Sequence, residues 1–158
     1  MDKKYGVYIC TCCVIGDALD IEKLCEVPKE EGFGNVKTHP FFCGKEGVGL
    51  LKKDITDEGV NTLVIAACSR RVNFDIFKFD GCIVDRVNLR EQVVWSHPKT
   101  EKPEDVADDE FIDHLQMMAE DYVKMSMARV EKIDLPEPFK VDTLSRKIMV
   151  IGGGITGI

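Results

Sequence analysis

The run Thr62-Leu-Val-Ile-Ala-Ala67 is apolar without interruption, and Gly59 precedes it while Cys68 follows it. Valine and isoleucine favour extended backbone, and an unbroken apolar strand is typical of a parallel sheet that is covered by helices on both faces. We therefore place this run at the centre of such a sheet.

Strand-like and helix-like patterns alternate on both sides of this run. Asp20 is expected to cap the first helix, Pro28 to end it, and Gly59 to follow the second helix. The expected strands are 5–10, 36–38, 62–67 and 82–85, and the expected helices are 21–27, 45–58, 73–79 and 88–95. The alternation predicts an α/β fold, doubly wound in the Rossmann or flavodoxin manner, with a mostly parallel sheet of about four strands and flanking helices.

Length and charge exclude several classes of protein. The 158 residues, 44% apolar and 31% charged, suit one globular domain with a core. The 21 basic and 28 acidic residues give a net charge of −7, and no basic cluster contains aromatic residues, so nucleic acid is not expected as a partner. No apolar run approaches the roughly 20 residues that cross a bilayer. The N-terminus lacks a secretory pattern, and a cytoplasmic location is expected.

A long helix and a linker are expected after His97. Apolar side chains recur at spacings of four and three, which predicts one amphipathic helix of about 25 residues within 99–134 that packs on the sheet or on a following domain. The stripe consists of Phe111, Leu115, Met118, Tyr122 and Met125. Leu135-Pro-Glu-Pro138 indicates a stiff linker over 135–146.

The last twelve residues resemble the start of another domain. Lys147-Ile-Met-Val-Ile151 predicts a strand, and the glycines after it, Gly152, Gly154 and Gly157, have the G-x-G-x-x-G spacing of a dinucleotide-binding turn. We therefore interpret 1–98 as a cysteine-rich α/β domain and 147–158 as the first strand and turn of a flavin- or nicotinamide-binding domain. The chain alone is not expected to bind a dinucleotide tightly, because the helix that would hold the phosphates is not included.

Seven cysteines in a chain expected in a reducing compartment indicate metal or thiol chemistry rather than disulfides. Ligands of doubly wound sheets bind at the carboxyl ends of the strands. That edge is expected to receive Cys10, Cys12, Cys43 and Cys68. Cys82 begins a strand at the opposite edge and Cys25 lies on an apolar helix face, so both are expected to be structural. Cys13 is left open.

Four converging thiolates suit a tetrahedral Zn²⁺ or a [4Fe–4S] cluster, although the spacing alone leaves a bare thiol site equally open. The segments 44–49 and 69–71 follow Cys43 and Cys68 and are expected to enter helices. Their backbone N–H groups could donate to cluster sulfurs and stabilise an anionic centre.

Several blocks of the chain are recognisable in order. They are Gly6-Val-Tyr-Ile-Cys-Thr-Cys12, Phe42-Cys-Gly44, Gly49-Leu-Leu-Lys-Lys-Asp-Ile55, Val64-Ile-Ala-Ala-Cys-Ser69, Val87-Asn-Leu-Arg-Glu-Gln92 with Trp95 and His97, and Val150-Ile-Gly-Gly-Gly-Ile-Thr-Gly157. Together they resemble the N-terminal region of the heterodisulfide reductase A-subunit family. Its members are FAD and iron–sulfur proteins of electron transfer, in some cases flavin-based bifurcation, that work with heterodisulfide-reducing subunits and with hydrogenase or formate dehydrogenase components.

The resemblance implies an iron–sulfur domain of a flavin oxidoreductase, with an FAD domain and ferredoxin-like modules beyond it. It implies Cys10, Cys12, Cys43 and Cys68 as the [4Fe–4S] ligands, the same set that the sheet edge selects. The family has glycine where this chain has Cys13, which keeps Cys12 and Cys13 open as alternatives. The family also has proline where this chain has Arg70, and this cation is expected to raise the reduction potential.

Other candidate roles remain beside these. Arg90 is expected to donate to a thiolate or cluster sulfur, to dock the next domain, or to pair with Glu91 or Asp85. His39 is a substitute ligand. Two competing functions are a zinc-braced docking module and a thiol enzyme that uses Cys10 with Cys12 or Cys13, but no obvious base lies beside either thiol.

Overall fold

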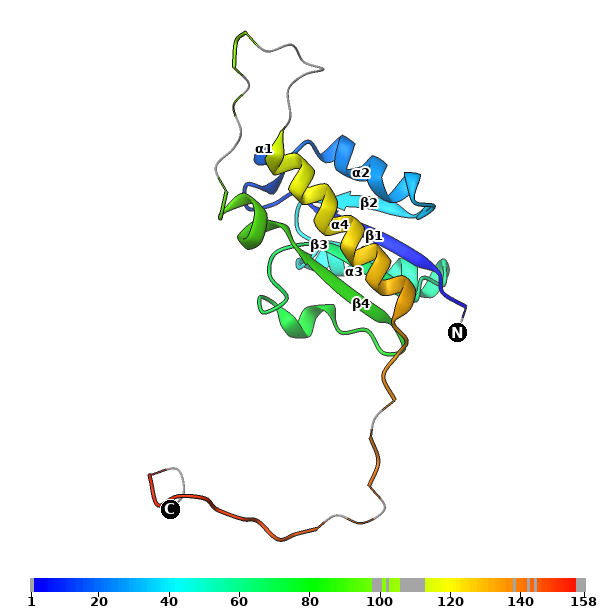
Figure 1. Cartoon of the computed structure of the whole chain (residues 1–158). Coiled ribbons are helices and arrows are strands. Elements are labelled where there is room, and N and C mark those ends of the chain that lie inside the picture. The colour runs from blue at the N-terminus through cyan, green and yellow to red at the C-terminus, as the bar shows by residue number, and fades with distance from the viewer. Residues whose placement is uncertain are drawn as a thin grey trace.

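The computed structural model describes residues 2–97, 101, 103–105, 113–137, 139–141, 143 and 145–155. Its centre is a sheet of four parallel strands in the order β2-β1-β3-β4 (Figure 1). The strands are β1 (Tyr5–Cys10), β2 (Val36–His39), β3 (Thr62–Ala67) and β4 (Ile83–Asn88). The α/β fold and the central position of 62–67 are thereby confirmed.

Successive side chains of β1 and β3 enter two separate cores, because strand side chains alternate between the faces of a sheet. Val7, Ile9 and Val64 belong to one core, and Tyr8 and Ile65 belong to the other. Both strands are therefore buried on both faces of the sheet, which explains the unbroken apolar run at 62–67.

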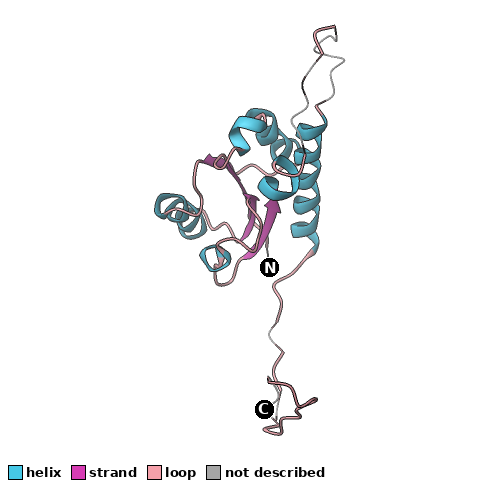
Figure 2. Cartoon of the chain, turned by 90° about the vertical axis from the view of Figure 1, so that its left-hand side faces the viewer, coloured by secondary structure: helices cyan, strands magenta, loops and turns pink. Residues whose placement is uncertain are grey.

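Helices lie on both faces of the sheet (Figure 2). One face is covered by α1 (Ile15–Ala18), α2 (Ile21–Glu30), α4 (His114–Lys132) and the π-helical turn η2 (Arg90–Val94). The other face is covered by α3 (Lys45–Asp57) and the 3₁₀ turn η1 (Phe74–Phe77). This three-layer arrangement leaves the carboxyl ends of the strands open to ligands.

The predicted caps are present, but one predicted helix end is wrong. Asp20 caps α2 by accepting a hydrogen bond from the backbone N–H of Lys23, and Gly59 follows α3 with φ of 69°. Pro28 lies inside α2, which continues to Glu30. A proline in the last turn removes only one helical hydrogen bond, and burial of Pro28 in the core offsets that loss.

The long helix α4 packs on β3 and β4 of the chain's own sheet, and its expected length and apolar stripe need correction. Its described part is α4, which has 19 residues and is capped by Asp113; Phe111 lies outside the described residues. The buried side chains of α4 are Leu115, Gln116, Ala119, Val123, Ser126, Met127 and Val130. Met125 of the expected stripe is not among them and is exposed.

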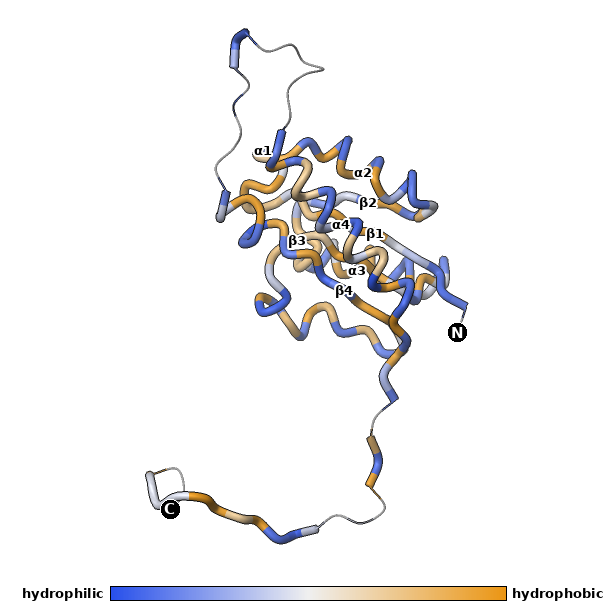
Figure 3. Tube along the Cα trace, viewed as in Figure 1, coloured by the Kyte–Doolittle hydropathy of each residue, from blue (hydrophilic) through white to orange (hydrophobic). Residues whose placement is uncertain are grey.

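Three expected elements differ from the structure, and one helix was not expected. The fourth strand starts at Ile83 and continues to Asn88, the helix expected at 73–79 is only the single turn η1, and α1 was not foreseen. The strand expected at 147–151 is not formed: these residues have no sheet partner in the described part of the chain, and Ile148 is 88% exposed. Figure 3 shows this apolar segment away from the sheet. A strand is stable only when it pairs with another strand. Residues 147–151 do not pair with β2 or β4, the edge strands of this sheet.

A polar network is buried between β1 and α3. The Tyr8 hydroxyl donates to Oδ2 of Asp54 at 2.9 Å, and Lys37 Nζ lies 2.6 Å from Oδ1 of Asp54 and 3.3 Å from Glu58. Burial, and then the adjacent Asp54 carboxylate, raise the pKa of Tyr8 far above its usual range. This network ties β1, β2 and α3 together.

No helix in the described ranges is long and apolar enough to cross a membrane.

Candidate metal centre

The sheet brings four predicted ligands to one edge. Cys10 ends β1, Cys12 follows two residues later, Cys43 lies in the loop after β2, and Cys68 comes directly after β3. Because all four strands are parallel, these positions share the carboxyl edge. Cys10 and Cys68 are buried, Cys12 and Cys43 are half-buried, and all are free thiols.

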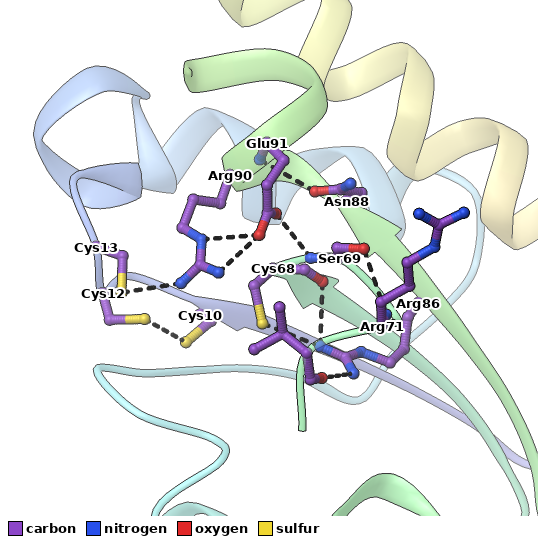
Figure 4. A network of polar contacts seen from close by, with 11 residues as sticks. Cys10, Cys12, Cys13, Cys68, Ser69, Arg71, Arg86, Asn88, Arg90 and Glu91 are labelled. Atoms are coloured by element: carbon purple, nitrogen blue, oxygen red, sulfur yellow. Dashed lines mark hydrogen bonds and ion pairs between the residues drawn. The ribbon is translucent and has the colours of Figure 1, made fainter. Parts of the chain in front are cut away.

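Two of the sulfurs are already neighbours. The Sγ atoms of Cys10 and Cys12 lie 3.4 Å apart (Figure 4). The Cys10 thiol also donates to the backbone carbonyl of Pro40, 3.3 Å away in the loop after β2. A tetrahedral Zn²⁺ with Zn–S bonds of about 2.3 Å would hold two sulfurs about 3.8 Å apart. The Cys10 and Cys12 pair therefore needs little movement to share one metal.

The chain reverses sharply after Cys12. Cys13 has φ of 56° and Val14 has φ of 66°, and the N–H of Ile15 donates back to the carbonyl of Cys12 at 3.1 Å. Left-handed backbone is costly for a β-branched residue such as Val14. Cys13 has the same left-handed backbone, which glycine at this position would adopt without strain. The turn places Cys13 at the surface.

Arg86 is a site residue that the sequence analysis missed. Its Nη2 lies 3.1 Å from both the Sγ and the carbonyl oxygen of Cys68, its Nη1 donates to the carbonyl of Val72 at 2.7 Å, and its guanidinium lies over the Phe77 ring. A buried cation that donates to a cysteine sulfur stabilises the thiolate or a metal bound to it. The available signal was a charged pair inside the strand sequence Val84-Asp-Arg-Val87.

Arg90 makes two of its predicted contacts at once, one with a cysteine sulfur and one with Glu91. It donates from Nη1 to Sγ of Cys13 at 3.4 Å and pairs with Oε1 of Glu91 at 2.6 Å through Nη2 (Figure 4). The other carboxylate oxygen of Glu91 accepts the N–H of Ser69 at 2.7 Å. Arg90 also lies 4.7 Å from the centre of the Trp95 ring. This chain of contacts connects the loops after β1, β3 and β4.

The other predicted residues lie apart from these contacts. Arg70 pairs with Asp85 at 2.9 Å and donates to no sulfur among the described residues. His39 uses Nδ1 to accept the N–H of Phe41. Gly152 and Gly154 lie in the exposed segment, and Gly157 lies outside the described residues. Cys25 packs against the core on the α2 and α4 side of the sheet, and Cys82 precedes β4 at the opposite edge.

The four cysteine thiols suit a thiophilic metal, although their sulfur atoms do not lie close enough together to bind one metal ion. Within the described part of the chain, no three His, Cys, Asp or Glu side chains are close enough to hold one metal ion. Four free cysteines nevertheless lie at one edge, with Arg86 donating to the sulfur of Cys68, and Arg90 donates to the sulfur of the adjoining Cys13; cysteine sulfurs with such donors are the ligand type of iron–sulfur clusters. The four cysteines therefore match an iron–sulfur site in the type of ligand atom and in their position at one edge of the sheet.

Comparison with known proteins identifies homologues of the chain. No family model matches the chain. It is 32% identical over 168 residues to the A subunit of the H(2):CoB-CoM heterodisulfide,ferredoxin reductase of Methanothermobacter thermautotrophicus, which covers 99% of this chain and 23% of the relative. It is 35% identical over 173 residues to a heterodisulfide reductase A-subunit-like protein of Archaeoglobus profundus, with 99% and 22% coverage. The chain is homologous to the A subunit of heterodisulfide reductase.

The homology is to a segment of larger proteins. A Methanopyrus kandleri relative, the second iron–sulfur A subunit of its CoB–CoM heterodisulfide reductase, is 28% identical over 99% of this chain and 24% of its own length. The chain therefore spans about a quarter of the length of the heterodisulfide reductase relatives that it matches.

The cysteines of this chain differ in acidity. Burial raises the pKa of Cys68, and Arg86 and Arg90 offset part of that rise. Cys12 also has a raised pKa because of burial and its sulfur neighbours, whereas hydrogen bonds, first from Cys12 and then from Arg90, lower the pKa of Cys13. Ligand thiols must lose protons to bind metal, so metal uptake should improve as pH rises.

We expect Arg90→Gln to slow the reaction of Cys13 with iodoacetamide several-fold at neutral pH in the metal-free chain. Loss of the guanidinium raises the pKa of Cys13, which reduces the reactive thiolate below that pKa and moves the rate profile to higher pH. Mass spectrometry of the alkylated peptide measures the rate. Arg146→Gln, an equal loss of charge in the exposed segment, should leave the rate unchanged; an unaltered rate in Arg90→Gln contradicts the assignment.

Proposed function

We propose that this chain is an electron-transfer domain of a heterodisulfide reductase of this family, holding one [4Fe–4S] cluster through Cys10, Cys12, Cys43 and Cys68. The observation that carries the proposal is the position of these four cysteines at the carboxyl edge of the sheet, with Arg86 donating to the sulfur of Cys68. When bound, the cluster would supply a one-electron redox centre. The chain's own residues hold it, shield it and set its electrostatic surroundings.

We further propose a domain organisation for the chain. Residues 1–98 form the cysteine-rich domain, 99–134 contain the helix that covers it, 135–146 are a linker, and 147–158 begin an FAD-binding domain with Gly152, Gly154 and Gly157 in its turn. The exposed apolar segment that includes Ile148 and Ile151 supports this organisation, because such a strand would be buried once paired. Electrons would pass between the cluster and FAD in the adjoining domain.

The relatives suggest the wider partners. One relative is the A subunit of the H(2)/formate:CoB-CoM heterodisulfide,ferredoxin reductase of Methanococcus maripaludis. We propose that the full protein works with other heterodisulfide reductase subunits and with electron-donating hydrogenase or formate dehydrogenase components.

A zinc-braced docking module is the second candidate, favoured by the 3.4 Å separation of the Cys10 and Cys12 sulfurs. Metal analysis separates the two functions. The chain should be purified and reconstituted without oxygen, and iron, acid-labile sulfide and zinc should be measured per chain. We expect about four irons and four sulfides, with an electron paramagnetic resonance signal after dithionite reduction. One zinc per chain, with no iron retained, would establish the docking module instead.

Cysteine-to-serine variants test the ligand assignment, with Cys25→Ser as the matched control. Cys68→Ser and Cys43→Ser should each lose most of the iron, whereas Cys25→Ser should retain it, because Cys25 lies on the other face of the sheet. Far-ultraviolet circular dichroism shows whether each variant is folded, and Cys43 is only half-buried, which makes its substitution the safer one. Equal iron in Cys25→Ser and in the two ligand variants would refute the ligand assignment.

A further inference from the structure

A polar cleft lies beyond the ends of β3 and β4, beside the cysteine edge. Its volume is about 580 Å³, within the range of small-molecule sites. We call it the arginine cleft and define it by its lining residues, Ser69, Arg70, Arg71, Arg86, Asn88 and Gln92. Every one of these side chains can donate a hydrogen bond.

The arginine cleft has positive charge that its surroundings do not neutralise. Arg70 is balanced by Asp85 at 2.9 Å, which also lies 3.6 Å from Arg129. No carboxylate in the described ranges lies within ion-pair distance of Arg71 or Arg86. Two unpaired cations in one cleft are notable in a chain with a net charge of −7. The cleft therefore favours an anion.

Arg86 gives the strongest reason to expect one. The residue is only 7% exposed, and both of its Nη atoms donate to uncharged acceptors, namely two backbone carbonyls and the thiol of Cys68. Its Nε is buried and has no hydrogen-bond partner among the described residues. Burying a cation without an anion is costly, and a buried donor without an acceptor adds to that cost.

Neutral donors complete the lining. Asn88 accepts the N–H of Glu91 through Oδ1, which leaves its amide NH₂ available. The side chain of Gln92 is exposed and has no hydrogen-bond partner in the described part of the chain. Amide and guanidinium donors around a polar cleft match the several acceptor oxygens of a phosphate, and arginine forks bind such groups in a bidentate manner.

We propose that the arginine cleft binds the phosphate groups of a small anionic molecule, either free phosphate or pyrophosphate, or the diphosphate of a nucleotide. Arg71 and Gln92 reach the ligand from the exposed rim, and Arg86 supplies charge from beneath. The proposal requires no bound metal, so the metal-free chain tests it separately from the electron-transfer function.

Titration calorimetry of the metal-free full chain tests the proposal with three probes: inorganic phosphate, inorganic pyrophosphate and ADP. We expect pyrophosphate to bind, and its affinity to fall as ionic strength rises. Arg71→Ala should weaken binding about tenfold, the usual consequence of losing one charge-assisted contact. Tighter binding of ADP than of pyrophosphate would identify a nucleotide as the ligand, and equal or weaker binding would identify the free anion.

Matched variants keep the test decisive. Arg146→Ala removes the same charge from the exposed segment and should bind pyrophosphate as the wild type does. Because Arg86 is buried and its loss can unfold the chain, Gln92→Ala serves as the second cleft variant and should weaken binding several-fold. Absence of binding for all three probes at millimolar concentration overturns the proposal, and so does equal weakening in Arg146→Ala and Arg71→Ala.

Discussion

Replacing Gly47 with alanine is expected to lower the free energy of unfolding by about 3 kcal/mol and to reduce metal binding. A Cβ on Gly47 would lie only 2.3 Å from the carbonyl oxygen of Phe41 and 2.5 Å from Cα of Phe42. These are backbone atoms, so no rotamer change relieves the clash. The loop that carries Cys43 would have to move away from α3, and one predicted ligand would leave the cysteine edge.

Gly49→Ala is the matched control, because Gly49 lies in α3 and an added Cβ would meet no atom within 4 Å. Alanine should stabilise the helix there by about 0.5–1 kcal/mol. Chemical denaturation gives the stability of both variants, and iron analysis after anaerobic reconstitution gives their metal content. A Gly47→Ala protein as stable as the wild type would show that the 41–44 loop is not held against α3.

Asp54→Ala is expected to destabilise the chain by a similar amount, about 3 kcal/mol, and to lower the midpoint of thermal unfolding by about 10 °C. The substitution leaves the buried Tyr8 hydroxyl without its acceptor and removes the closest partner of Lys37. Lys37 is one-third exposed, so water compensates part of its loss, and most of the cost falls on Tyr8.

A double-mutant cycle separates these two costs. Tyr8→Phe should restore part of the stability in the Asp54→Ala background, because it removes the unsatisfied hydroxyl. Asp57→Ala, which removes an exposed carboxylate from the last turn of the same helix, should change stability by less than about 0.5 kcal/mol. Equal unfolding midpoints for the Asp54 and Asp57 variants would contradict the importance of the buried network.

The sheet and the shared location of the cysteines were predictable because both follow from strand order. An unbroken apolar run, regular alternation with helices and parallel pairing together place Cys10 and Cys68 at one edge, whatever their spacing in the sequence. Cys25 and Cys82 were excluded by the same reasoning. The caps Asp20 and Gly59 were predictable because each depends on a local backbone requirement.

Side-chain partners were harder to predict, since they depend on contacts between distant segments. Arg70 lies next to Ser69 in the loop after Cys68, yet its guanidinium turns to Asp85, whereas Arg86 from β4 reaches the Cys68 sulfur. The stripe of α4 was misplaced at Met125 for a similar reason, because the contacts of α4 with β3 and β4 decide which of its side chains are buried. Pairing across elements is visible only after the strands are in register.

The position of Arg86 has a thermodynamic consequence. One guanidinium contacts the Cys68 sulfur and also lines the arginine cleft. Any change at that sulfur that alters its negative charge must alter the affinity of the cleft for an anion, and linkage requires the reverse effect to be equal in free energy. Protonation, metal binding or reduction at the cysteine edge would thus change the affinity of the arginine cleft for an anion. A higher anion concentration would in turn shift the protonation, metal-binding or redox equilibrium of the Cys68 sulfur.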